Sequence, residues 1–252
     1  MVEKTFLFQG QTLFMPADFF IEDSSKYGEE FIIPSRGNIP SIKIIDAPTD
    51  VTVGESFVDV RTAISLVNEA EAETIFRAFH IVQWRRESVF CGRCGHKNID
   101  GEQRITQEIT RVCPNCGRVE FPRICPAVIV LITDGEDRIL LAHNRKFRPE
   151  VFSLIAGFNE PGETLEETVA REVMEEIGVL VKNIHYAASQ AWPFPNSLMT
   201  GWTASYASGR VKPDGVEIEK AQWFDRDRLP ELPMKGSIAQ KLIDRWRNGV
   251  CL

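Results

Sequence analysis

The sequence predicts an α/β protein in which helices flank a mixed sheet, preceded by a small α+β domain and a cysteine-containing ribbon. Two β-prone runs at 127–133 and 138–144 enclose an Asp-Gly-Glu-Asp turn and predict a hairpin. A strand at 152–156 is followed by a helix with a one-sided apolar stripe. We expect domain boundaries at 1–88, 89–122 and 123–252.

The first segment, 1–88, mixes short β-prone stretches with turn residues and ends in a long amphipathic helix. We expect strands at Thr5–Phe8, Ser41–Ile45 and Ser56–Val60 and a helix at about 68–86. Apolar residues of that helix recur at helical spacing. These patterns favour a small α+β domain, and nothing in it taken alone indicates chemistry.

The second segment contains two cysteine pairs of equal spacing. Cys91-Gly-Arg-Cys94 and Cys113-Pro-Asn-Cys116 are separated by eighteen residues. Two such knuckles place four thiolates at tetrahedral corners, which is the arrangement of a structural zinc ribbon with one Zn²⁺ per chain. Disulfides are the alternative, and a reducing compartment disfavours them.

The third segment continues with β-prone runs at 184–188, 198–207 and 222–224 and ends in a helix at about 238–247. Helices flanking a mixed sheet give an α/β/α sandwich.

Composition excludes several classes of protein. The chain has 252 residues, 43% of them hydrophobic, which is enough for ordinary globular cores. A net charge of -7 argues against a protein that binds nucleic acid mainly through a basic surface. The longest apolar run is too short for a membrane helix, so we expect a cytoplasmic protein without membrane contact.

Three carboxylates gather on the helix that follows the 152–156 strand. Glu172, Glu175 and Glu176 fall on one side of it, beside an apolar stripe that contains Val173 and Ile177. Like charges three and four residues apart repel each other, so their concentration indicates a bound divalent cation. A solvated acidic face is the alternative. The glycine-punctuated loop before the helix and Gly178 after it favour the metal site.

Residues 157–179 resemble the signature of the Nudix hydrolases: Gly, five residues, Glu, seven residues, Arg-Glu, an aliphatic, any residue, Glu-Glu, any residue, Gly, an aliphatic. The resemblance implies an α/β/α Nudix sandwich that hydrolyses a pyrophosphate bond with Mg²⁺ or Mn²⁺. It also implies metal ligands: Glu172, Glu176, the Ala156 carbonyl and a later carboxylate, Glu217, with Glu219 as the fallback.

The general base varies among such enzymes; Glu176 is our first candidate and Glu175 the second. Glu163, in the first turn of the helix, is expected to complement the helix dipole and to bond loop amides. Arg171 is expected to hold the loop and the glutamates in place. Neither residue is expected to take part directly.

The segment Ser189-Gln-Ala-Trp-Pro-Phe-Pro-Asn-Ser197 presents two aromatic rings in a loop that two prolines stiffen. Alone, it would predict a turn with buried aromatics. Together with the cysteine knuckles it resembles the NADH pyrophosphatase branch of the Nudix superfamily, whose mark is Ser-Gln-Pro-Trp-Pro-Phe-Pro-x-Ser. Ala191 stands where that family has proline, which leaves the stiffness of the loop in doubt.

This resemblance implies cleavage of NADH, and more weakly NAD⁺, to a nicotinamide mononucleotide and AMP. It also implies removal of NAD caps from RNA 5′ ends by a homodimer with sites built partly across its interface. The substrate-binding residues that it implies are Gln190, Ala191, Trp192, Pro193, Phe194, Pro195, Asn196, Ser197, Phe121, Glu108, Arg61 and Ala239. Phe121 would stack on a base.

Two alternatives stay open. The first is Nudix activity on another nucleoside diphosphate derivative, such as ADP-ribose or a dinucleoside polyphosphate. The second is a non-catalytic, zinc-stabilised module that binds nucleotides or RNA. Inert Nudix domains usually lose a core glutamate, and none is missing here.

Overall fold

The computed structural model describes residues 4–15, 28–35, 40–49, 57–101, 108–135 and 137–250. The chain divides into two compact units, which we describe separately. The first comprises Met1–Arg123 together with Pro193–Asn196, and the second comprises Ile124–Trp192 and Ser197–Leu252. Within the described residues, none of the helices has the length and apolar content needed to cross a membrane.

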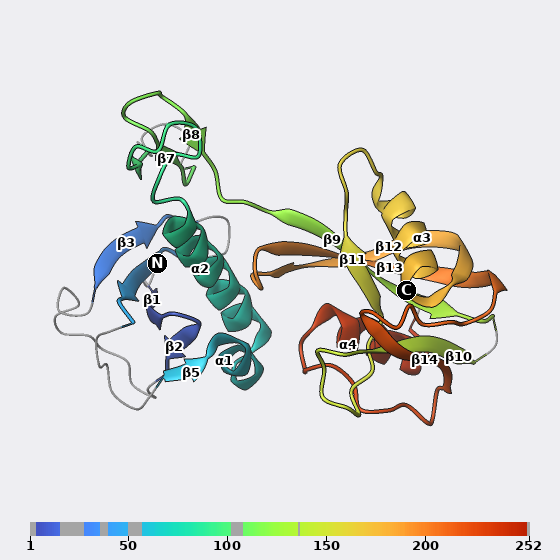
Figure 1. Cartoon of the computed structure of the whole chain (residues 1–252). Helices are drawn as coiled ribbons and strands as arrows, with labels where there is room; N and C mark the ends of the chain where they lie inside the picture. The colour runs from blue at the N-terminus through green and yellow to red at the C-terminus, as the bar shows by residue number, and fades with distance from the viewer. Residues whose placement is uncertain are drawn as a thin grey trace. The chain divides into compact units, whose positions relative to one another are not determined.

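The first unit begins with a five-stranded sheet of order β3-β4-β1-β2-β5 (Figure 1). Its elements are β1 (Lys4–Gln9), β2 (Thr12–Phe14), β3 (Glu29–Ile33), β4 (Ile42–Ala47), β5 (Phe57–Asp59), α1 (Val60–Leu66) and α2 (Glu69–Glu87). β1 and β4 are parallel, and the other three pairs are antiparallel. The α+β character expected for this segment is present.

Helix α2 begins at the N-cap Asn68 and packs Phe79 against Phe8 of β1, with ring centroids 5.6 Å apart.

Helix α1 differs from the sequence prediction, which extended a strand from Ser56 to Val60. Ser56 lies outside the described residues, while Val60 starts a helix because the Asp59 side chain accepts a hydrogen bond from the Arg61 N–H and caps it.

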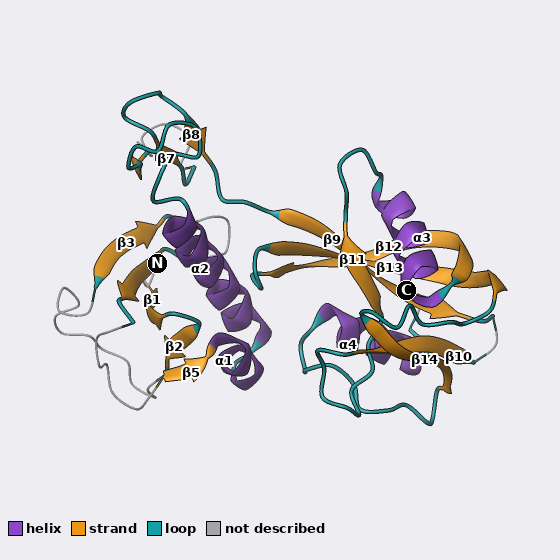
Figure 2. Ribbon diagram, in the orientation of Figure 1, coloured by secondary structure: helices purple, strands orange, loops and turns teal. Residues whose placement is uncertain are grey.

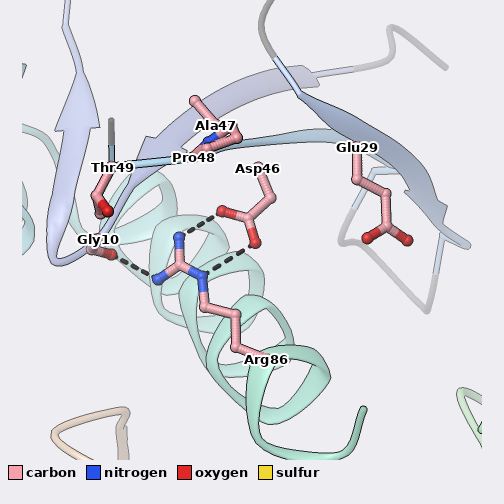
Figure 3. A pocket seen from close by; sticks show the side chains of 7 residues that line it. All are labelled: Gly10, Glu29, Asp46, Ala47, Pro48, Thr49 and Arg86. Atoms are coloured by element: carbon pink, nitrogen blue, oxygen red, sulfur yellow. Dashed lines mark hydrogen bonds and ion pairs between the residues drawn. The ribbon is translucent and has the colours of Figure 1, made fainter. Parts of the chain in front are cut away.

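Arg86 ties α2 to the sheet beneath it (Figure 3). Its guanidinium pairs with both carboxylate oxygens of Asp46, and Nη1 donates to the Gly10 carbonyl at 2.7 Å. These groups border a cavity of about 420 Å³ that is lined by Gly10, Glu29, Asp46, Ala47, Pro48, Thr49 and Arg86. Because the donor groups of Arg86 bond to residues of this same unit, Arg86 holds α2 against the sheet.

The cysteine-containing ribbon follows α2 and carries a small antiparallel sheet of order β6-β7-β8. The strands are β6 (Ile99–Asp100), β7 (Arg111–Val112) and β8 (Val119–Glu120). The buried Arg111 side chain donates to the Arg85 carbonyl at the end of α2, at 3.0 Å. This bond joins the ribbon to the long helix of the same unit.

The second unit contains a six-stranded mixed sheet of order β12-β13-β9-β10-β14, with β11 paired to β9 off this path (Figure 2). Its elements are β9 (Cys125–Thr133), β10 (Arg138–Asn144), β11 (Ile155–Phe158), α3 (Leu165–Ile177), β12 (Val179–Trp192), β13 (Ser197–Gly209), β14 (Ile218–Asp225) and α4 (Ile238–Arg247). β13 runs parallel to β9, and every other pair is antiparallel.

The two helices of this unit cover opposite faces of the sheet. Val169, Val173 and Ile177 of α3 pack into one buried cluster with Val130 and Ile155. The other face packs against α4 in a second cluster, which contains Ile129, Leu131, Ile238, Leu242 and Trp246. Strand alternation explains the division, because successive β9 residues point to opposite faces. The mixed α/β architecture expected from the sequence is confirmed.

Three strand predictions for this unit differ from the structure. The last strand was expected at 222–224, but β14 runs from Ile218 to Asp225. The third strand was expected at 152–156, but ladder pairing with β9 begins only at Ile155 and continues to Phe158. The hairpin β12–β13 extends further than expected, to Trp192 and from Ser197, so residues 189–192 are strand and the connection is only Pro193–Asn196. Bulges in β12 interrupt its period-two pattern, which explains the short prediction.

Candidate active site

Helix α3 has strong signals at both ends. Thr164 and Glu167 form a capping box, in which Thr164 Oγ1 accepts from the Glu167 N–H and the Glu167 carboxylate accepts from the Thr164 N–H. The helix ends at Gly178, whose φ of 71° is left-handed. Both ends of the carboxylate-bearing helix are therefore fixed by local sequence.

Arg171 connects the loop to the glutamates. Its guanidinium donates to both oxygens of Glu163 at 2.5 and 2.9 Å, to Glu172 Oε1 at 2.9 Å and to Glu175 Oε2 at 3.1 Å. It also reaches the Phe158 carbonyl at 2.9 Å. The bonds from Arg171 lower the pKa of Glu163 to about 2, so Glu163 is a fixed anion that anchors this network.

Gly157 provides space for the carboxylate of Glu172. A Cβ on Gly157 would lie 1.9 Å from the Glu172 carboxyl carbon and about as close to both oxygens. Any larger residue at position 157 would displace that carboxylate. Burial raises the pKa of Glu172, although Arg171 opposes this shift.

Glu176 is the most deeply placed of the three helix glutamates. Its side chain is buried, and its Oε2 has no hydrogen-bond partner in the structure. Burial, together with the charges of Glu172, Glu217, Asp214 and Glu175, raises the pKa of Glu176 to about 8. A buried carboxylate with an unpaired oxygen among other acids is a site that a cation would stabilise.

Glu217 and Glu219, the two candidates for the later carboxylate ligand, have different surroundings. Glu217 is close enough to Glu176 to raise its pKa. Glu219 lies instead near the buried His143, with Oε2 3.6 Å from Nε2, while His143 Nδ1 contacts the Val151 carbonyl at 2.9 Å. The charge of Glu217 therefore acts on Glu176. His143 had no signal in the sequence beyond a polar residue in an apolar strand.

The four cysteines form a much tighter group than the glutamates. Their sulfur atoms all lie within 4.8 Å of one another. Among the described residues, no three carboxylates have oxygen atoms that lie this close together. Sγ–Sγ distances of 3.7 Å between Cys91 and Cys116 and 3.4 Å between Cys94 and Cys113 exclude disulfides. Four thiolates bound to one Zn²⁺ would be about 3.8 Å apart.

The two knuckles have the same backbone arrangement. Cys91 N–H donates to the His96 carbonyl and Cys113 N–H to the Arg118 carbonyl, at 2.8 and 2.9 Å. Gly95 and Gly117 take left-handed φ values of 74° and 70° and donate back to the first cysteine of each pair. This repeated geometry turns all four sulfur atoms toward one point, and the donor set fits a structural metal ion.

The substrate segment predicted at 190–197 is divided between strand ends and the connection. Gln190 Nε2 donates to the Gly236 carbonyl at 2.8 Å, and Oε1 accepts from the Ile238 N–H at 2.7 Å. Gln190 therefore fixes the start of α4 in this structure. Ala191 and Trp192 end β12, and Ser197, which is buried, begins β13.

Residues 193–196 belong to the first unit, where they contact α1 and α2. The Phe194 ring centroid lies 5.6 Å from that of Phe79 and 4.6 Å from the Arg61 guanidinium. Gln83 Nε2 donates to the carbonyls of Pro193 and Pro195 at 2.6 and 2.9 Å. Arg61, which the resemblance placed at the substrate, is thus in contact with Phe194. Asn196 is buried.

The other predicted residues have different environments. Phe121 is 57% exposed and Glu108 is exposed, both in the first unit. Ala239 lies in the first turn of α4 with its side chain in the core. Ala156 lies in β11 directly before Gly157. Phe158, the last residue of β11, has a 51% exposed ring and had no signal in the sequence.

Comparison with known proteins agrees with this geometry. The NUDIX domain model matches residues 123–246. The Nudix hydrolase structure from Nitrosomonas europaea superposes with a TM-score of 0.54 at 23% identity, covering 63% of this chain and 90% of that one. This similarity shows the fold. Relatives at 45% and 42% identity, of which 69% and 74% are covered, show that the chain belongs to the Nudix hydrolase superfamily and, within it, to the NADH pyrophosphatase family.

Those relatives carry the name NAD-capped RNA hydrolase NudC. The protein from Pseudomonas aeruginosa LESB58 is 49% identical over 164 residues, which are 65% of this chain and 57% of that protein. The Chromobacterium violaceum protein is 45% identical, with 74% of this chain and 69% of the relative covered. The Haemophilus influenzae protein is 42% identical, with 76% and 74% covered. The chain thus spans little more than half of the Pseudomonas relative.

Proposed function

We propose that this protein hydrolyses the pyrophosphate bond of NADH, and of NAD⁺, to a nicotinamide mononucleotide and AMP, and that it removes the NAD cap from RNA 5′ ends. The observation that carries the proposal is the buried Glu176, whose Oε2 has no partner and whose neighbours are other carboxylates. The names of relatives at 42% to 49% identity supply the substrate.

Glu172, Glu176, Glu217 and the Ala156 carbonyl would hold Mg²⁺ or Mn²⁺. Hard oxygen donors suit these ions. The space over Gly157, which only a residue without a side chain leaves free, supports Glu172 as a ligand. When bound, the cations neutralise charge on the phosphoryl oxygens and make water a better nucleophile.

Side chains of the protein would position the reacting groups and accept the proton of the attacking water. Glu176 is our first candidate for the general base, because its raised pKa favours the uptake of a proton. Glu175 is the second candidate, and it is exposed and bonded to Arg171. Arg171 would fix both the loop and Glu172, as its hydrogen bonds indicate.

One Zn²⁺ per chain would be bound by Cys91, Cys94, Cys113 and Cys116. The spacing of the sulfur atoms supports this assignment. Four cysteines arranged for a metal ion rather than for disulfides also support a reducing, cytoplasmic location. The ion would stabilise the ribbon and take no part in the reaction, since four protein ligands leave no open position.

The segment 190–197, with Phe121, Glu108, Arg61 and Ala239, would bind the dinucleotide. The contact between Phe194 and Arg61 supports a shared role for these two residues. Phe158, exposed beside the loop, is a further candidate for stacking on a base. We also propose that the protein is a homodimer.

The test is an assay of NADH with Mn²⁺ in which AMP and the reduced nicotinamide mononucleotide are quantified by chromatography. We expect both products in equal amounts, and a Glu176→Gln variant slower by several orders of magnitude. ADP-ribose and dinucleoside polyphosphates serve as competing substrates. Absence of AMP from NADH, or faster turnover of ADP-ribose, would replace the proposal with another Nudix activity.

A further inference from the structure

Asp214 lies in the connection between β13 and β14, and its carboxylate accepts three backbone hydrogen bonds. Oδ1 accepts from the N–H groups of Val216 at 3.1 Å and Ile218 at 2.8 Å, and Oδ2 accepts from the Glu217 N–H at 3.1 Å. The Asp214 main-chain N–H donates to the Glu176 carbonyl at 2.9 Å. A single residue therefore bonds both the end of α3 and the segment that carries Glu217.

The main chain of Glu217 is held on its other side as well. Its carbonyl accepts from the Arg145 N–H at 3.0 Å, and Gly215 N–H donates to the Ile218 carbonyl at 3.1 Å. Gly215 has a left-handed φ of 73°, which lets the chain turn tightly around the Asp214 carboxylate. The result is a closed turn built around one anion.

Glu217 needs such support because its carboxylate is repelled by the carboxylate of Glu176. Asp214 bonds the main chains of both Glu176 and Glu217, which keeps the two residues close, and like charges held close together repel each other. Glu217 is also exposed, and packing does not hold its side chain. Three hydrogen bonds to an ionised carboxylate are stronger than bonds to a neutral group, so Asp214 can hold the turn against that repulsion.

We propose that Asp214 is a positioning residue for the hydrolysis: it fixes Glu217 relative to Glu176, so that both carboxylates can bind the same divalent cations. The inference rests on the proposed function, because it assigns Glu217 to the metal site. In this role Asp214 acts through the main chain of residues 216–218. Partners of metal ligands commonly change metal affinity by 10- to 100-fold when removed.

Two substitutions and one control separate this role from a general contribution to folding. Asp214→Ala removes all three bonds. Asp214→Asn keeps an oxygen for Val216 and Ile218 but presents an amide group to the Glu217 N–H. The control is Asp134→Ala, since Asp134 also bonds a backbone N–H in a turn of this unit, that of Arg138 at 3.4 Å.

Mn²⁺ binding to the full-length chain, followed by electron paramagnetic resonance of the free ion, gives the readout. We expect the Mn²⁺ affinity to fall 10- to 100-fold in Asp214→Ala and less in Asp214→Asn, with no change in Asp134→Ala. The Mn²⁺ concentration for half-maximal NADH hydrolysis should rise by the same factor, while KM for NADH at saturating Mn²⁺ stays constant. Hydrogen exchange at the amides of 216–218 should accelerate.

Different results of these measurements would overturn either the role of Asp214 alone or the proposed function as well. Wild-type Mn²⁺ affinity in Asp214→Ala, or an equal loss in Asp134→Ala, would overturn the positioning role while leaving the proposed function intact. If Asp214→Ala does not fold, Asp214→Asn decides by the same comparison. A wild-type chain that neither binds Mn²⁺ nor hydrolyses NADH would remove the proposed function, and this inference with it.

Discussion

Replacing Gly157 with alanine is the most specific perturbation that the site geometry suggests. The new Cβ would lie 1.9 Å from the carboxyl carbon of Glu172, whereas ordinary carbon contacts are about 3.5 to 4.0 Å. The carboxylate must therefore move by at least about 1.5 Å. Because the end of a flexible side chain moves and Gly157 lies in β11, the fold itself should tolerate the change.

We expect Gly157→Ala to lower kcat/KM for NADH by about 100-fold, since misplacement of a catalytic group by about 1 Å can cost that much. The free energy of unfolding, measured by thermal denaturation, should stay within about 1 kcal/mol of the wild-type value, because alanine also reduces the entropy of the unfolded chain. Gly92→Ala is the matched control: nothing lies within 4 Å of its Cβ. Full activity in Gly157→Ala would refute the placement of Glu172 in the metal site.

Two further predictions concern stability. Because the pKa of Glu176 is raised to about 8 in the folded chain, the contribution of Glu176 to the stability of the metal-free protein should be fully present below the unfolded pKa of about 4.5 and be lost as pH rises through about 8. Glu176→Gln should remove that dependence and be more stable than wild type at pH 8 without metal; identical melting curves for the two proteins across this range would contradict the burial argument. Cys113→Ser should lose zinc, measured by atomic absorption, and destabilise the first unit, whereas retained zinc at one ion per chain would refute the four-sulfur site.

Local patterns predicted some elements with correct bounds. β10 and α4 occupy the ranges expected from the sequence, since each has an uninterrupted period and clear flanking residues. Helix α1 was missed because seven residues are too few for a periodic signal, and its start depends on the Asp59 cap. The bulges of β12 concealed the full length of that strand.

The site could be predicted as a set of residues but not as an arrangement. The spacing of the glutamates on α3 placed them on one side of a helix, as the structure has them. The sequence could not indicate that Gly157 lies beneath Glu172, because the two residues meet only through the packing of β11 on α3. Asp214 followed by glycine is typical of any turn, and its link to Glu176 depends on tertiary structure.

We expect Glu172, Glu176 and Glu217 to bind divalent cations together. Anomalous scattering from crystals soaked in Mn²⁺ would locate the ions. We expect a peak within about 2.3 Å of an oxygen of Glu176, with oxygens of Glu172 and Glu217 in or next to its coordination shell. Crystals at saturating Mn²⁺ with no peak among these three carboxylates would contradict the account.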